Sequence, residues 1–275
     1  MTAEIYINSR KPVRRETSVS MNSIIYGPVP SWRLGRSLGI DLLSTQGKTC
    51  SFDCVYCQLG RTIYPLAERK EFVNIARLSE ELERVNGVVA DYVTFSGVGE
   101  PTLAANLGEA IELARSVLRL PVAVLTNSSL MNKRDVCQEL SLADVVVAKV
   151  DAPNEELFRK INQPIVECSL AELVQALMQF REEYTVKLAL QMMFIDENKD
   201  CAEEMARLAE LISPDEVQLN TALRPCAVKP LFPEDMKLLK SEFSSLKKVI
   251  TVYEAAKFEV TSFNAKETLR RRPEV

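Results

Sequence analysis

The chain has 275 residues, of which 47% are hydrophobic and 26% charged, and this is enough to build a sizeable hydrophobic core. Its net charge is −4, and it contains seven cysteines and no histidine. This composition provides no overall basic surface for nucleic acid, and it excludes histidine as a metal ligand or general base.

The sequence carries no sign of a targeting or membrane segment. Residues 1–20 lack the long apolar centre of a signal peptide, and no apolar run reaches the roughly 18 residues of a transmembrane helix. Four cysteines are scattered singly, which argues against a disulfide framework. We therefore expect a cytoplasmic protein that contacts no membrane. The basic groups "KPVRR" and "LRRRP" near the two ends are short, and we expect them to be solvated tails.

Short apolar runs alternate with amphipathic stretches along the chain. Strands are expected at residues 35–43, 91–97, 121–129, 144–153, 185–196 and 215–225. Helices are expected at residues 105–118, 132–141, 154–161, 200–212 and 233–246. The spacing of Ser169 with Glu172, and of Asp200 with Glu203, is that of a capping box and predicts a helix start at each place.

Strands that are apolar throughout and followed by helices indicate a parallel sheet buried on both faces. We predict an α/β fold, an open and partial (β/α)6 barrel of the TIM type, with a doubly wound open sheet as the alternative. All of residues 1–275 would form one domain, with a core at about 36–245. An N-terminal extension and an ordered C-terminal extension flank this core, and the last forty or so residues show no recognisable chemistry. Either fold would gather the polar loops at the carboxyl ends of the strands into one site.

The first of these loops contains "CSFDCVYC", with Cys50, Cys54 and Cys57. A structural zinc site would need a fourth ligand from a second Cys or His pair, which the chain lacks. Redox chemistry at a Cys-x-x-Cys pair would leave Cys50 without a role. An iron–sulfur cluster held by three thiolates would keep one iron open for a substrate or cosubstrate.

The motif resembles the Cys-x3-Cys-x2-Cys signature of radical S-adenosylmethionine (SAM) enzymes. The resemblance implies that the three cysteines hold a [4Fe-4S] cluster and that SAM binds its fourth iron. Reductive cleavage of SAM would then give a 5′-deoxyadenosyl radical for hydrogen abstraction. It also implies an electron donor such as flavodoxin or ferredoxin.

Further positions match the SAM-binding residues of that superfamily. "SGVGEP" resembles its Gly-Gly-Glu motif, with Val98 in place of one glycine, and Tyr56 stands where the superfamily lines the adenine. Lys149 departs from the small polar residue expected there, and its ammonium would suit the SAM carboxylate. The candidate SAM-binding residues are Tyr56, Gly97, Gly99, Glu100, Asn127, Lys149, Asp151 and Gln191.

A narrower resemblance covers almost the whole chain and is to the radical SAM family that includes the tRNA wyosine-synthesis enzyme. That enzyme holds a second cluster on cysteines upstream of the signature, and residues 1–49 contain none. We therefore expect an unidentified small-molecule or peptide substrate. RNA-base modification is a less favoured alternative, and a non-enzymatic iron–sulfur electron-transfer or metal-binding protein is another.

Three more residues lie in or next to the predicted strands. Cys226 ends the strand at 215–225, so we expect it to face the site near the other loops. It is a candidate catalytic residue, either as a radical quencher or as a ligand, although a buried filler is the simpler interpretation. Arg33 and Arg36 would either clamp an anionic substrate or pair with acidic neighbours.

Overall fold

The computed structural model describes residues 23–256 and 258–273 and has a curved eight-stranded sheet at its centre. Its strand order is β1-β2-β5-β6-β7-β8-β9-β10. The strands are β1 (Ile25–Ser31), β2 (Gly35–Ile40), β5 (Tyr92–Phe95), β6 (Val122–Thr126), β7 (Val145–Lys149), β8 (Lys187–Phe194), β9 (Glu216–Thr221) and β10 (Val249–Thr251). From β2 to β10 every pairing is parallel, and only β1 runs antiparallel to its neighbour.

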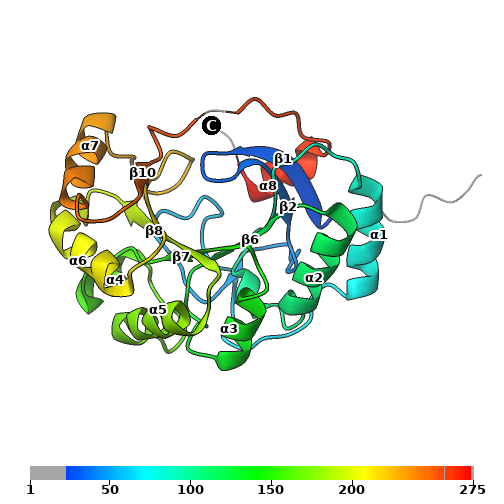
Figure 1. The fold of residues 1–275 in the computed structure, drawn as a ribbon, viewed down its shortest axis with the longest axis horizontal. Helices are drawn as coiled ribbons and strands as arrows, with labels where there is room; N and C mark the ends of the chain where they lie inside the picture. Colours follow the sequence, from blue (N-terminus) through cyan, green and yellow to red (C-terminus); the bar gives the residue numbers. More distant parts are fainter. Residues whose placement is uncertain (1–22, 257, 274–275) are drawn as a thin grey trace, which may run out of the picture.

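The predicted partial barrel is confirmed. Each of the six predicted strands is present, and their order in the sheet follows their order in the chain without the reversal that defines a doubly wound sheet. The sheet curls into an open half-barrel with helices around its outer side (Figure 1). Two strands extend the predicted set, β1 at one edge and β10 at the other.

Helices α1 to α7 pack on the outer side of the sheet, and α8 lies near the C-terminus (Figure 1). They are α1 (Ile75–Val85), α2 (Leu107–Leu118), α3 (Arg134–Leu140), α4 (Glu155–Ile161), α5 (Leu170–Glu183), α6 (Ala202–Ile212), α7 (Pro233–Glu242) and α8 (Ala265–Arg271). The capping box of Ser169 and Glu172 is confirmed at the start of α5. The one predicted at Asp200 is wrong, because a 3-10 turn at Lys199–Cys201 precedes α6 and leaves Cys201 at its N-cap with no side-chain bond.

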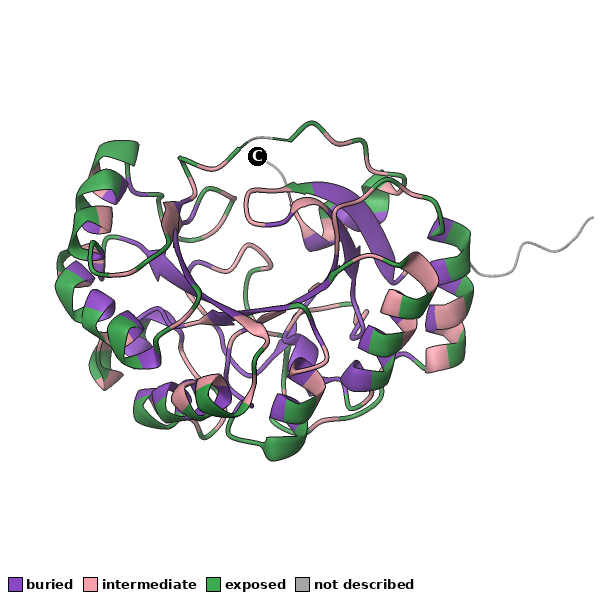
Figure 2. Ribbon diagram, viewed as in Figure 1, coloured by how far each residue is buried: buried purple, intermediate pink, exposed green. Residues whose placement is uncertain are grey.

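Most residues of the central strands are buried, as the purple colour in Figure 2 shows. In β7, Val146 and Ala148 pack in the large core that the helices cover. Val145 and Val147 point the other way and belong to a small cluster with Leu34 inside the barrel. This alternation explains why the strand reads as a continuous apolar run.

The C-terminal segment crosses the open side of the half-barrel. After β10 it passes over this side to α8, which lies beside β1 (Figure 1). The Phe263 N–H donates to the Gly27 carbonyl at 2.9 Å, and Arg271 is only 2% exposed. The prediction of a solvated "LRRRP" tail is therefore wrong for Arg271.

The other terminal predictions concern residues 1–22. The "KPVRR" group and most of the expected N-terminal extension lie outside the described residues. Within residues 23–256 and 258–273, no helix is both long and apolar enough to cross a membrane.

Candidate functional site

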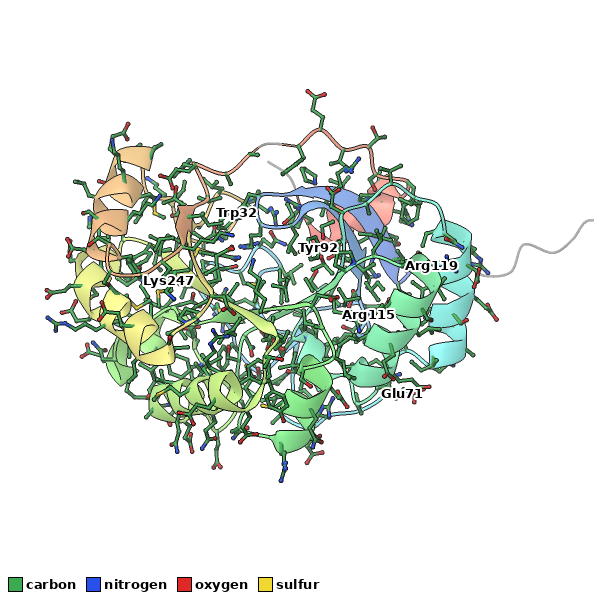
Figure 3. All side chains as sticks on the ribbon, viewed as in Figure 1. Trp32, Glu71, Tyr92, Arg115, Arg119 and Lys247 are labelled. Atoms are coloured by element: carbon green, nitrogen blue, oxygen red, sulfur yellow. The ribbon has the colours of Figure 1, made fainter. Side chains whose placement is uncertain are left out.

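One cavity of about 630 Å³ opens at the carboxyl ends of the parallel strands. The loops after β2, β5, β6 and β9 and the carboxyl-terminal parts of β7 and β8 all contribute to its wall, as the barrel topology predicts. The hairpin between β1 and β2, with Trp32 at its tip (Figure 3), and the segment after β10 close its remaining side. The cavity therefore has polar loops on one side and edge segments on the other.

The cysteine loop leaves β2 and forms one wall of this cavity, with all three thiols of Cys50, Cys54 and Cys57 along it. Two backbone bonds hold the loop against the end of α4, from the Asp53 N–H to the Gln163 carbonyl and from the Val55 N–H to the Ile161 carbonyl, each at 3.0 Å. The loop is therefore fixed against the end of α4, which suits a rigid ligand set.

Amide side chains donate to two of the thiols. Asn127 Nδ2 lies 3.5 Å from Cys50 Sγ, and Asn162 Nδ2 lies 3.6 Å from Cys54 Sγ. Burial, followed by the charge of Glu100, raises the pKa of Cys50 to about 12. A bound cation would therefore be needed to keep this thiol ionised at neutral pH.

Lys48 lies beside the three thiols and is 5% exposed. Burial alone would lower its pKa, but the neighbouring charges of Cys57, Cys50 and Cys54 outweigh burial and raise the pKa of Lys48. This lysine therefore offers a fixed positive charge next to a thiolate-bound group.

The donor set fits a multi-iron cluster better than a single ion. Among the described residues, no three Cys, Asp or Glu side chains form a group that could hold a metal ion. The three thiols therefore do not converge on one point, as the closed tetrahedral site of a single zinc ion requires. The three thiols on one wall, with open cavity in front of them, are the donors that a cluster with one iron free of protein ligands requires.

The loop after β5 packs directly on the cysteine loop. The Glu100 N–H donates to the Thr49 carbonyl at 3.1 Å, and a Cβ at Gly99 would lie 1.6 Å from that carbonyl oxygen. Gly97 is also needed for close packing, since a Cβ there would lie 2.2 Å from Asp41 Cγ. The two glycines thus bring the motif loop against its neighbours.

The Glu100 carboxylate accepts hydrogen bonds from residues at the end of β6. Its Oε1 accepts from Thr126 Oγ1 at 2.7 Å and from the Thr102 N–H and hydroxyl, and its Oε2 accepts from the Asn127 N–H at 2.6 Å. Burial raises the pKa of Glu100, although these hydrogen bonds act in the opposite direction. Glu100 is also the only carboxylate among the described residues that line the cavity.

A second polar network surrounds Tyr56. Its hydroxyl donates to Asp151 Oδ2 and accepts from Lys149 Nζ at 2.8 Å, and the Lys149 ammonium also lies 4.3 Å from the centre of the tyrosine ring. Asn162 Nδ2 donates to the same Asp151 oxygen at 2.8 Å. Burial and the charge of Asp151 raise the pKa of Tyr56 well above its usual value, so its hydroxyl keeps its proton.

The structure brings most of the candidate site residues to the cavity wall. Those that line it are Cys50, Cys54, Tyr56, Cys57, Gly99, Glu100, Asn127, Lys149 and Gln191. Gly97 and Asp151 do not line it, and they act on its wall through Asp41 and through Tyr56.

Cys226 does not face the cavity, contrary to expectation. After β9 the chain still lines the cavity from Ala222 to Arg224 and only then turns away, and the Cys226 thiol donates to the Val228 carbonyl at 3.3 Å. Its side chain packs against a small apolar cluster that includes Ile161 and Ile195. The buried-filler interpretation fits this placement, and neither a catalytic role nor a role as a fourth ligand gains support.

Several cavity residues were not predicted from the sequence. They are Trp32, Lys48, Gln58, Phe258 and Arg272. Lys48 could have been noticed from its position just before the first cysteine. Arg272 and Phe258 belong to a C-terminal segment whose return to the barrel mouth has no local signal in the sequence.

Comparisons with known proteins agree with this site. Residues 46–209 match the model of the family described as the radical SAM superfamily. A UPF0026 protein of Methanocaldococcus jannaschii is 36% identical over 235 residues, which cover 83% of this chain and 72% of the relative. A UPF0026 protein of Synechocystis sp. is 41% identical over 208 residues, which cover 75% of this chain and 77% of the relative.

Solved structures share the fold at low sequence identity. TYW1 with a lysine-pyruvate adduct bound has a TM-score of 0.58 at 16% identity, over 76% of this chain and 73% of that one. Native anSMEcpe with bound AdoMet has a TM-score of 0.58 at 16% identity, over 79% of this chain and 64% of that one. The family match includes the three cysteines and the glycine–glutamate loop. The chain therefore belongs to the radical SAM superfamily, a class of enzymes that implies SAM and an iron–sulfur cluster as cofactors.

Proposed function

We infer that this protein is a radical SAM enzyme that cleaves SAM reductively at a [4Fe-4S] cluster and abstracts hydrogen from a small-molecule or peptide substrate. The observation that carries this inference is the shared cavity. Cys50, Cys54 and Cys57 line one wall, and candidate SAM-binding groups from four successive strand ends line the rest. The cluster and SAM would together supply a 5′-deoxyadenosyl radical, with the electron delivered by a donor such as flavodoxin or ferredoxin.

The protein's own groups would bind and orient the two cofactors. The three thiolates would hold the cluster, and Lys48 beside them would balance part of its negative charge. Glu100 offers an acceptor for the SAM amino group, and Lys149 offers a cation for its carboxylate. Asp151 positions both Tyr56 and Lys149 through the bonds described above, with Lys149 Nζ 3.7 Å from Asp151 Oδ2.

The test is anaerobic reconstitution followed by iron analysis, EPR and an assay for 5′-deoxyadenosine. We expect about four irons per chain and an EPR signal that changes when SAM is added. A Cys50/Cys54/Cys57→Ala triple variant should lose both. A Cys137/Cys168/Cys201→Ala triple variant is the matched control, since it also removes three thiols but none from the cavity wall.

Two results would contradict the proposal. Iron that persists in the Cys50/Cys54/Cys57 variant would show that the metal is held elsewhere. An EPR signal that SAM leaves unchanged would favour a closed cluster and the electron-transfer alternative.

A further inference from the structure

The cavity is strongly basic although the chain as a whole is acidic. Its charged lining residues other than the cysteines are five cations and one carboxylate, namely Arg33, Lys48, Lys149, Arg224, Arg272 and Glu100. The net charge of the whole chain is −4. The cavity therefore has a positive electrostatic potential, which attracts anionic ligands.

The two lysines are accounted for by groups on the cluster side. Lys48 faces the cysteine thiols and lies 3.6 Å from Asp53 Oδ1. Lys149 bonds to Tyr56 and pairs with Asp151. The positive charge on the other side of the cavity comes from the three arginines and does not depend on these lysines.

The three arginines come from the edges of the half-barrel. Arg33 lies in the turn between β1 and β2, Arg224 follows β9, and Arg272 follows α8. Arg224 NH1 donates to Gln58 Oε1 at 2.5 Å, and Gln58 in turn donates to the Arg271 carbonyl at 2.9 Å. These contacts bring segments that are distant in sequence to the same side of the mouth.

Among the three arginines, Arg33 has the most fully described contacts, and within the described residues these include no ion pair. Its NH2 group donates to the neutral Gln191 Oε1, and its guanidinium carbon lies 4.4 Å from the centre of the Trp32 ring. Its Nε is buried and has no hydrogen-bond partner, and no carboxylate of the described residues forms an ion pair with it. Burial, and then the charges of Arg224 and Arg272, lower the pKa of Arg33 to about 9 against the opposing charge of Glu216, and this still leaves Arg33 protonated at neutral pH. A guanidinium that feels a distant carboxylate but forms no ion pair with one can take an anion from a ligand.

We propose that Arg33, Arg224 and Arg272 bind a compact dianionic group, a phosphate ester or a dicarboxylate, on the substrate of this enzyme. This inference rests on the proposed function, because the ligand is called a substrate only on the ground that it would share the cavity with the cluster thiols. Three guanidinium groups match two negative charges through paired, fork-shaped hydrogen bonds. The aromatic and apolar lining from Trp32 and Phe258 would contact the rest of the molecule.

The experiment measures the thermal unfolding midpoint of the full chain with inorganic phosphate or malonate at millimolar concentration. Acetate and chloride at equal ionic strength serve as references. At least one dianion should raise the midpoint, because a ligand that binds only the folded state stabilises it. Arg33→Gln and Arg224→Gln should each weaken the apparent affinity about tenfold or more.

The matched control is Arg36→Gln, which removes one positive charge from the same hairpin. Arg36 does not line the cavity, and it pairs with Asp91 at 2.6 Å in a half-exposed position. Its variant should bind the dianion like the wild type. A response to phosphate alone would identify a phosphate ester, and a response to malonate alone would identify a dicarboxylate.

Four results would overturn the proposal. They are no shift with either dianion, an equal loss in Arg33→Gln and Arg36→Gln, stabilisation by tRNA alone, and disappearance of the dianion effect in reconstituted protein saturated with SAM. The last would assign the arginines to the SAM carboxylate. The binding measurement needs no cluster, so a failure to reconstitute iron would count against the proposed function and leave this result standing.

Discussion

Arg271 Nε donates to Asp41 Oδ2 at 2.7 Å across 230 positions of sequence, and both side chains are almost completely buried. Asp41 follows β2 and packs against Gly97, while its Oδ1 accepts from the N–H groups of Leu43 and Ser44 at the start of the cysteine loop. Arg271 also donates to Glu267 Oε2 at 2.6 Å. The C-terminal helix is thereby fixed to the base of both the cysteine loop and the glycine–glutamate loop.

Arg271→Ala should lower the free energy of unfolding by about 3–5 kcal/mol, because it leaves the Asp41 carboxylate buried without its cation. Chemical denaturation monitored by circular dichroism measures this change. Arg159→Ala is the control, since its pair with Glu155 is exposed and should be worth about 0.5 kcal/mol or less. Equal losses in the two variants would contradict the role given to Arg271.

Gly99→Ala should separate the motif loop from the cysteine loop, because the new Cβ would lie 1.6 Å from the Thr49 carbonyl oxygen. We expect a loss of about 1–3 kcal/mol in stability and less iron after reconstitution. Gly87→Asn is the control, with φ of +92° and no neighbouring atom within 4 Å of a Cβ. It should cost about 1 kcal/mol through its backbone conformation and leave iron binding unchanged. Normal iron content in Gly99→Ala would contradict the close-packing argument.

The parts of the fold that could be predicted are those whose cause is local. β7 is buried on both faces and reads as an apolar run, and β8 does so for the same reason. β1 was missed because its sequence "IYGPVPS" contains glycine and two prolines, which weaken any strand pattern, and β10 has only three residues.

The parts of the site that could not be predicted depend on contacts between distant segments. Nothing in the run "RRR" shows that Arg271 is the residue turned toward Asp41, since that choice is set by how α8 docks on β1. The predicted position of Cys226 at the cavity is wrong because the strand expected at 215–225 ends earlier than its pattern indicates, at Thr221. The cysteine motif itself was recognisable because its three ligands lie within eight residues.

Glu216 should make part of the stability dependent on pH. Burial alone would raise its pKa, but hydrogen bonds from Lys248, Gln218 and Lys187 outweigh burial and hold the pKa of Glu216 below its usual value of 4.5. A carboxyl group with a lowered folded-state pKa stabilises the protein fully above the unfolded value, and this stabilisation is lost as the pH falls through the folded value.

Glu216→Gln should therefore destabilise the protein by about 1–3 kcal/mol at neutral pH. The difference from the wild type should shrink as the pH falls below 4.5. Urea unfolding at a series of pH values measures both effects. Glu203→Gln, at an exposed position, should give a small difference at every pH. A Glu216 difference that stays constant down to acid pH would show that its charge is not what matters.

Asn162 and Asn127 should tune the reduction potential of the proposed cluster, because each amide donates to a ligand thiol, of Cys54 and Cys50 respectively. A hydrogen bond to a ligand sulfur favours the reduced cluster, which carries more negative charge. Asn162→Ala and Asn127→Ala should each lower the midpoint potential while about four irons per chain are retained. Anaerobic titration followed by EPR measures it. Asn86→Ala, at an exposed position after α1, is the control and should leave the potential unchanged. A potential that is unchanged or raised in both cavity variants, with full iron content, would show that these amides serve only to position the loop.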